Sequence, residues 1–117
     1  MTTINIFRSA RDLVAYEPGQ VVFKAGDVGD VMYAVVEGKV DITLDAQCIE
    51  TVEEGGIFGE MALVEEGVRM AAATATAPTK LAKVDKQHFI YLVQEHPTFA
   101  LQVMKIMSER IRNANEH

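Results

Sequence analysis

One arginine stands in a run of small apolar residues, just after an acidic segment. Residues 58–75 read FGEMALVEEGVRMAAATA, and Arg69 is the only cation among them. A guanidinium is costly to desolvate, so it is rarely placed among such residues unless an anion meets it. Its planar fork of donors suits a carboxylate or a phosphate. The segment therefore predicts an anion-binding site at Arg69.

The residues before Arg69 predict further anion-binding groups. Residues 58–62 are expected to leave a strand and form a short helical turn, where Gly59 permits close backbone approach. The first N–H groups of such a turn have no partner inside it and point outward. Small side chains at residues 71–73 leave room for a ligand beside the next strand. A phosphate between these amides and Arg69 fits this arrangement.

Glu60 cannot favour a phosphate by its charge, so it needs another role in such a site. Carboxylates beside phosphate sites accept hydrogen bonds from sugar hydroxyls in other nucleotide-binding folds. Phosphate and ribose recognition on one short segment indicates a nucleotide. The plainer alternative is that Glu60 and Arg69 form an exposed ion pair, worth less than about 1 kcal/mol.

The first two thirds of the chain predict short strands separated by tight turns. Turn signals recur as Pro-Gly at 18–19, Gly-Asp at 26–27 and 29–30, and Gly-Gly at 55–56. The 31–44 run divides at residues 37–38, Glu-Gly, which predicts a hairpin. Other runs typical of strands cover 21–23, 48–52, 70–75 and 81–84. About eight strands at this spacing indicate an antiparallel, jelly-roll-like β-roll, or double-stranded β-helix, over roughly residues 13–84.

The last third, roughly residues 85–115, predicts two helices. Asp85 is a natural N-cap for the first, and Pro97 suits the first turn of the second. In the second helix one stripe holds Phe99, Val103, Ile106 and Arg110, and a neighbouring stripe holds Leu101, Met104, Met107 and Ile111. The fold class is thus mainly β with C-terminal helices, and residues 1–117 are expected to form a single domain.

Composition narrows the function classes. Acids outnumber Lys and Arg by 17 to 11, and the net charge of −6 argues against nucleic-acid binding. No apolar run approaches the roughly 20 residues that a membrane span needs, and no signal-peptide core begins the chain. The single cysteine, Cys48, cannot form an internal disulfide and favours a reducing compartment. We expect a cytoplasmic protein that binds no membrane.

The sequence contains no catalytic constellation. His88, His96 and His117 all fall in the helical part, whereas cupins, the other common small β-rolls, take their metal ligands from the roll itself. We therefore expect no enzyme activity, no metal and no cofactor. A cupin-like metalloenzyme is a third interpretation, which a metal bound in the roll would support.

These features resemble the cyclic nucleotide-binding domain family, shared by the catabolite activator protein, the regulatory subunits of cAMP-dependent protein kinase and cyclic-nucleotide-gated channels. The stretch YEPGQVVFKAGDVGDVMYAVVEGKVDI is similar to the family's opening strands and turns. FGEMALVEEGVRMAAATA is similar to its phosphate-binding cassette, with Gly-Glu, a small-residue pair, and Arg ten positions after the glycine. FIYLVQEHPTFALQVMKIMSERIR is similar to the family's helices after the roll. The resemblance covers nearly the whole chain.

The resemblance implies the ligand contacts of the cassette. Glu60 is expected to bind the ribose 2′-hydroxyl of the nucleotide. Backbone amides around Gly59, Met61 and Ala62 are expected to hold the cyclic phosphate, which Arg69 neutralises.

Met70 and Ala71 follow Arg69 and complete the predicted ligand-binding set. Many family members have Ser, Thr or Ala where Met70 stands, and Thr there is associated with a preference for cGMP. Because Met supplies no hydroxyl, the expected ligand is cAMP. Val68 replaces a frequent Pro and Ala72 a frequent Thr, so the phosphate relies on Arg69 and main-chain donors alone.

The family's mode of action implies a sensor or regulatory domain whose C-terminal helices move when the ligand binds. In the family the final helix caps the base, and Asn113 and Asn115 are candidates for that cap, unless they belong to a solvated helix end. Met104, Met107 and Ile111 predict a short two-fold seam between copies of the chain. The family's transcription factors carry a helix-turn-helix after this helix, which the sequence lacks, so direct DNA binding is not expected. The signal would pass to an unidentified protein partner, another copy or a domain outside this sequence.

A second interpretation comes from a different functional class. Met70 and the missing hydroxyls are also what a degenerate family member would show, one that binds no nucleotide and serves as a protein-interaction module. Whether a cyclic nucleotide raises the melting temperature distinguishes the two interpretations.

Overall fold

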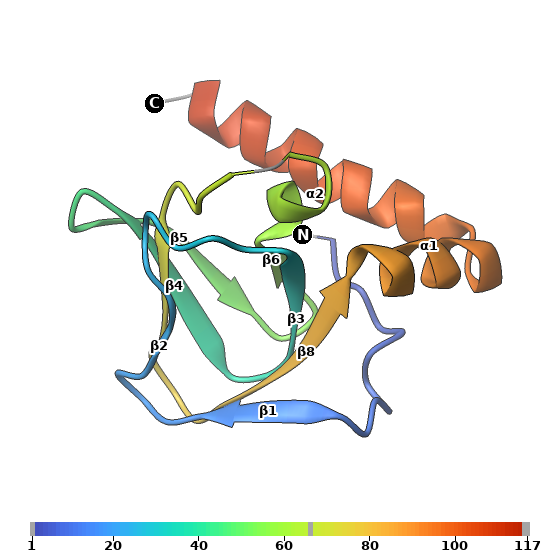
Figure 1. Ribbon diagram of the computed structural model, residues 1–117, viewed down its shortest axis with the longest axis horizontal. Helices are drawn as coiled ribbons and strands as arrows, with labels where there is room; N and C mark the ends of the chain where they lie inside the picture. Colours follow the sequence, from blue (N-terminus) through green and yellow to red (C-terminus); the bar gives the residue numbers. More distant parts are fainter. Residues whose placement is uncertain (1, 66, 116–117) are drawn as a thin grey trace.

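The computed structural model describes residues 2–65 and 67–115. Within them, two four-stranded antiparallel sheets are followed by two helices (Figure 1). The predicted fold, an antiparallel roll of about eight strands with two C-terminal helices, is confirmed. The strands are β1 Leu13–Tyr16, β2 Val21–Phe23, β3 Val31–Glu37, β4 Lys39–Leu44, β5 Gln47–Glu53, β6 Ile57–Phe58, β7 Ala72–Ala75 and β8 Thr79–Asp85. The helices are a short 3₁₀ helix, η1 Glu60–Leu63, then α1 Lys86–Glu95 and α2 Thr98–Asn115.

The chain passes from one sheet to the other between all consecutive strands except β4 and β5, and the strand orders are β1-β8-β3-β6 and β2-β7-β4-β5. The hairpin predicted at residues 37–38 is therefore wrong, because β3 and β4 lie in different sheets. Gly38 turns this corner with a φ of 98°, and a Cβ there would lie 2.4 Å from the Thr79 hydroxyl. That hydroxyl is buried and accepts from the Lys39 amide at 3.2 Å. The backbone thus crosses to the second sheet and does not pair back on itself.

The hairpin that does form joins β4 to β5. Asp45 and Ala46 make its two-residue loop, and both have positive φ, at 52° and 65°. A loop of this kind matches the right-handed twist of the strands on either side. It sets the register in which Leu44 lies opposite Gln47, and a one-residue shift between Thr43 and Ile42 then places Ile42 of β4 opposite Glu50 of β5.

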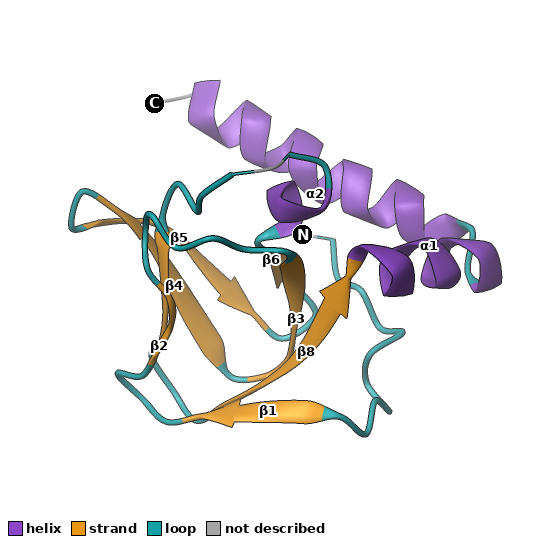
Figure 2. Cartoon of the chain, in the orientation of Figure 1, coloured by secondary structure: helices purple, strands orange, loops and turns teal. Residues whose placement is uncertain are grey.

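The two helices lie on one side of the strands (Figure 2). Asp85 caps α1 as predicted, since its carboxylate accepts from the His88 amide at 2.8 Å. The predicted apolar stripe of α2 is also confirmed, because Phe99, Val103 and Ile106 are buried in the core beneath it.

The neighbouring stripe of α2 divides between core and surface. Met107 is half-buried and packs against the core, so the predicted seam of Met104, Met107 and Ile111 is corrected at its middle residue. Leu101, Met104 and Ile111 are exposed instead. They lie three and seven positions apart, which places them on one face of the helix.

Residues 2–65 and 67–115 contain neither a helix that could span a membrane nor a cluster of metal-binding side chains. Neither α1 nor α2 has the length and apolarity that crossing a membrane requires. No group of three or more His, Cys, Asp or Glu in this part of the chain is arranged to hold a metal ion. His117 lies outside the described residues.

Candidate functional site

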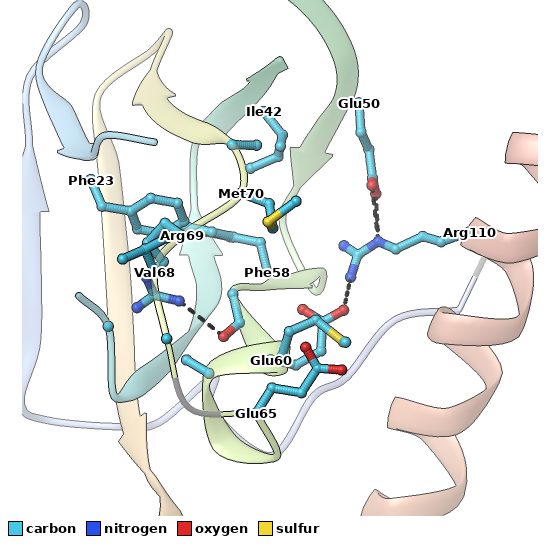
Figure 3. A pocket seen from close by; sticks show the side chains of 16 residues that line it. Phe23, Ile42, Glu50, Phe58, Glu60, Glu65, Val68, Arg69, Met70 and Arg110 are labelled. Atoms are coloured by element: carbon cyan, nitrogen blue, oxygen red, sulfur yellow. Dashed lines mark hydrogen bonds and ion pairs between the residues drawn. The ribbon is translucent and has the colours of Figure 1, made fainter. Parts of the chain in front are cut away.

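A cavity of about 420 Å³ lies between η1, the segment before β7 and one end of α2 (Figure 3). Its volume falls in the range of small-molecule sites. The seven residues that the sequence predicts as ligand contacts all line it: Gly59, Glu60, Met61, Ala62, Arg69, Met70 and Ala71. Phe23, Phe58 and Ile42 supply apolar surface to the same cavity.

Arg69 is buried at the edge of this cavity, with 9% of its surface exposed. Its Nη1 donates to the Gly59 carbonyl at 3.1 Å and its Nη2 to the Val31 carbonyl at 2.7 Å. The Phe23 ring lies below it, with Cζ 4.2 Å from the ring centroid, so a cation–π contact adds to these bonds. Arg69 forms none of the ion pairs found in the described residues, so the exposed Glu60–Arg69 ion pair is wrong.

Two glycines make room for the Arg69 guanidinium. A Cβ built on Gly29 would lie 2.1 Å from Arg69 Nε, and one on Gly59 would lie 2.8 Å from Nη1. Both distances are far below van der Waals contact. Gly59 also has a φ of 75°, which favours glycine, whereas Gly29 is not among the residues with positive φ. Gly29 is therefore required for space alone.

Gly59 is also the N-cap of η1, and Met61 and Ala62 in the first turn of that helix line the cavity. The Ala62 amide forms a long bond of 3.3 Å to the Gly59 carbonyl. The Met61 amide has no hydrogen-bond acceptor within residues 2–65 and 67–115. An orphan donor at the start of a helical turn, beside a buried cation, is a favourable place for an anion.

Glu60 lies at the other side of the cavity and binds Arg110 of α2. Arg110 Nη1 donates to Glu60 Oε1 at 2.5 Å, and Nε donates to both oxygens of Glu50 on β5, at 2.9 and 3.1 Å (Figure 3). Nη2 donates to the Ile57 carbonyl. One arginine thus joins the last turns of α2 to β5, β6 and η1, which we call the Arg110 clasp.

The Arg110 clasp lies in a partly desolvated setting. The side chains of Arg110, Glu60 and Glu50 are 24%, 11% and 37% exposed. Burial by itself lowers the pKa of Arg110, but the charges of Glu60 and Glu50 and their hydrogen bonds outweigh this, so the pKa lies above its ordinary value. Arg110 therefore stays charged, and it balances only one of the two acids it binds.

Sequence reasoning missed Glu50 and Arg110 as site residues. The signal for Arg110 was present, since it continues the buried stripe of Phe99, Val103 and Ile106, and a cation at the end of such a stripe needs a buried acid. Glu50 gave no such signal. Its place in the cavity depends on how β4 pairs with β5, and hence on a turn that has no glycine.

The structure does not bring the predicted base-capping residues to this cavity. Asn113 lines a second cavity of about 290 Å³ on the far side of the Arg110–Glu50 pair. Asn115 is exposed in the last turn of α2. Their role as a cap stays a prediction.

The space at Gly29 gives a test of where Arg69 lies. We expect Gly29→Ala to lower the free energy of unfolding by about 1–3 kcal/mol, because the new methyl group displaces the guanidinium. Urea unfolding measures this. In an Arg69→Ala background, Gly29→Ala should change the free energy of unfolding little, because the guanidinium that the new methyl group would meet is absent. An equal cost in both backgrounds would contradict the described contact.

Comparisons with known proteins agree with this geometry. The family model for the cyclic nucleotide-binding domain matches residues 13–96. The cyclic AMP receptor protein of Thermus thermophilus is 30% identical over 105 residues, which cover 86% of this chain and 49% of that protein. Lysophospholipase nte1 of Aspergillus fumigatus is 31% identical over 112 residues, 92% of this chain and 7% of that protein.

A solved structure shares the fold, and its sequence identity to this chain is close to that of the two relatives above. The crystal structure of the Thermus thermophilus catabolite activator protein superimposes with a TM-score of 0.78 at 29% identity, over 95% of this chain and 55% of that one. The chain therefore spans about half of the receptor protein, and a small part of the lysophospholipase. The matched fold is a regulatory, non-catalytic one. On this evidence the chain belongs to the cyclic nucleotide-binding domain family.

Proposed function

We propose that this cyclic nucleotide-binding regulatory domain senses cAMP and transmits binding through α2. The observation that carries the proposal is the buried Arg69 beside the Met61 amide of η1, which has no acceptor within residues 2–65 and 67–115, both at one cavity. A guanidinium has five N–H donors, and the bonds to Gly59 and Val31 leave three for a phosphate. The phosphate is the group that this part of the cavity fits.

The ribose is assigned to Glu60. Arg110 binds only Oε1 of this carboxylate, so Oε2 is available to accept from a 2′-hydroxyl. Met70 offers no hydroxyl to the ligand, which supports cAMP over cGMP, as does the similarity to a protein named as a cyclic AMP receptor. The backbone and Arg69 then supply most of the phosphate's hydrogen bonds.

The Arg110 clasp is the proposed route from the ligand to α2. Ribose binding at Glu60 changes the hydrogen bonding of the carboxylate that holds Arg110. Because the same arginine binds Glu50 and Ile57, any change is passed to the last turns of α2. In this proposal the end of α2 has two positions, one with and one without ligand, and the ligand shifts the population between them.

We further propose that a second copy of this chain covers the exposed face of α2. Leu101, Met104 and Ile111 are 63%, 56% and 63% exposed and share that face. Their spacing suits a short two-helix seam. In a longer protein that contains this domain, the same face of α2 would contact the part that receives the signal.

Thermal unfolding tests the ligand. At 100 times its dissociation constant, cAMP should stabilise the chain by about 2.7 kcal/mol, a rise of roughly 10 °C in melting temperature. We expect a smaller rise with cGMP. The shift should vanish in Arg69→Ala and shrink in Glu60→Ala, each compared with the same variant without ligand.

Arg112→Ala is the matched control, because Arg112 is an exposed arginine of α2 outside the cavity. It should keep the full shift. No shift with either nucleotide at millimolar concentration would favour the protein-interaction module. A shift that survives Arg69→Ala would place the ligand elsewhere.

Hydrogen exchange tests the route through α2. Adding cAMP should change amide exchange in residues 106–113 of the wild-type chain. In Arg110→Met that change should be lost, although cAMP still changes exchange in η1, because the clasp is the link that is removed. An unchanged response of α2 in Arg110→Met would contradict the clasp as the route.

Sedimentation equilibrium tests the second copy. We expect the wild-type chain to dimerise and Met104→Glu to be monomeric, because a charge at the centre of an apolar seam is left unpaired. Ile90→Glu, at an exposed apolar position of α1, should leave the dimer intact. A monomeric wild-type chain at high micromolar concentration would rule out this partner.

A further inference from the structure

Four residues form a row across the sheet beneath the cavity. Phe23 of β2 lies opposite Ala73 of β7, which lies opposite Ile42 of β4, which lies opposite Glu50 of β5. Directly paired residues share one face of a sheet. Phe23, Ile42 and Glu50 all line the cavity. The row therefore forms a floor that begins at an aromatic ring and ends at a carboxylate.

The two ends of this floor differ in charge. Arg69 stacks on Phe23 at the first end, so this end suits a phosphate. Glu50 lies three strand spacings away, at about 4.8 Å each, or roughly 14 Å. Glu60 lies next to that far end, since Glu60 and Glu50 bind the same arginine. A nucleotide with its phosphate at Arg69 and its ribose at Glu60 thus extends its base over Ile42 toward Glu50.

We propose that Glu50 is a specificity residue that reads the position-6 substituent of the purine. This inference rests on the proposed function and names the group that selects the base. Arg110 Nε approaches both Glu50 oxygens, and a carboxylate has about four lone-pair sites, so each oxygen still accepts another hydrogen bond. The exocyclic amino group of adenine donates to such an oxygen. The carbonyl of hypoxanthine or guanine at that position is an acceptor and is repelled.

Arg110 does not contact the base itself, but it holds the Glu50 carboxylate in position for this selection. It fixes the Glu50 carboxylate by two hydrogen bonds, and its single positive charge is shared with Glu60. Glu50 therefore keeps net negative character where the base edge arrives. Glu65 also lines the cavity, but it is exposed and is not part of the row. It serves as the matched control.

The test compares cAMP with two analogues: the 3′,5′-cyclic monophosphate of purine riboside, which differs only in having hydrogen at position 6, and cyclic IMP, which has oxygen there and a hydrogen on N1. Calorimetry gives each dissociation constant. We expect the wild-type chain to bind cAMP at least about tenfold more tightly than the purine riboside analogue, as one hydrogen bond to a charged group predicts. Cyclic IMP should also bind more weakly than cAMP, because it lacks the exocyclic amino group.

Three variants assign the selection to Glu50. Glu50→Met removes the acceptor at similar volume and should bring the three affinities within about threefold of one another. Glu50→Gln keeps one acceptor oxygen and should retain part of the preference. Glu65→Gln should leave the wild-type order unchanged. Because each ratio is taken within one variant, a general loss of affinity from a loosened Arg110 cancels.

Two outcomes overturn the inference, and they differ in what else they overturn. Equal binding of all three ligands by the wild-type chain, or an unchanged preference in Glu50→Met, refutes the role of Glu50 and leaves the cyclic nucleotide site intact. Failure of all three ligands to bind refutes the proposed ligand class as well. A preference that collapses in Glu50→Met and persists in Glu65→Gln supports the inference.

Discussion

The structure around the cavity depends on the cost of burying one guanidinium. Arg69 is nine-tenths buried, and no acid within residues 2–65 and 67–115 forms an ion pair with it. Two backbone carbonyls and an aromatic ring supply its contacts, and none of them neutralises it. The local backbone is arranged around this charge, since Gly29 and Gly59 lack the atoms that would collide with it. A buried cation that is hydrogen-bonded but not neutralised favours an anion, which is the physical basis for a phosphate here.

The second arginine of the site has the opposite arrangement. Arg110 is paired with two carboxylates, so the far side of the cavity carries excess negative charge. The cavity is therefore polarised, with a cation and an orphan amide at one end and acids at the other. A ligand with an anionic end and a hydroxyl- or amine-bearing end matches this polarity. Because Arg110 belongs to α2, the acids that line this end of the cavity also hold the helix.

Much of this could be predicted from the sequence, for identifiable reasons. Strand-forming runs and turn residues indicated the roll, and the segment from Gly59 to Arg69 indicated residues that line the cavity, because these signals are local. The β3–β4 connection was mispredicted, since a Glu-Gly pair is typical of a hairpin and nothing local revealed the hydrogen bonds between Lys39 and the distant Thr79. Met107 was placed in a surface stripe because helical spacing alone does not say which face a neighbouring sheet covers. Glu50 was missed because its position depends on strand register, which is a tertiary property.

The most direct test of the account is a crystal structure of the chain grown with cAMP. The account predicts phosphate oxygens within hydrogen-bond distance of Arg69 and of the Met61 amide, with the ribose hydroxyl on Glu60. A nucleotide bound in the second cavity, or one whose phosphate lies away from an unchanged Arg69, would contradict it.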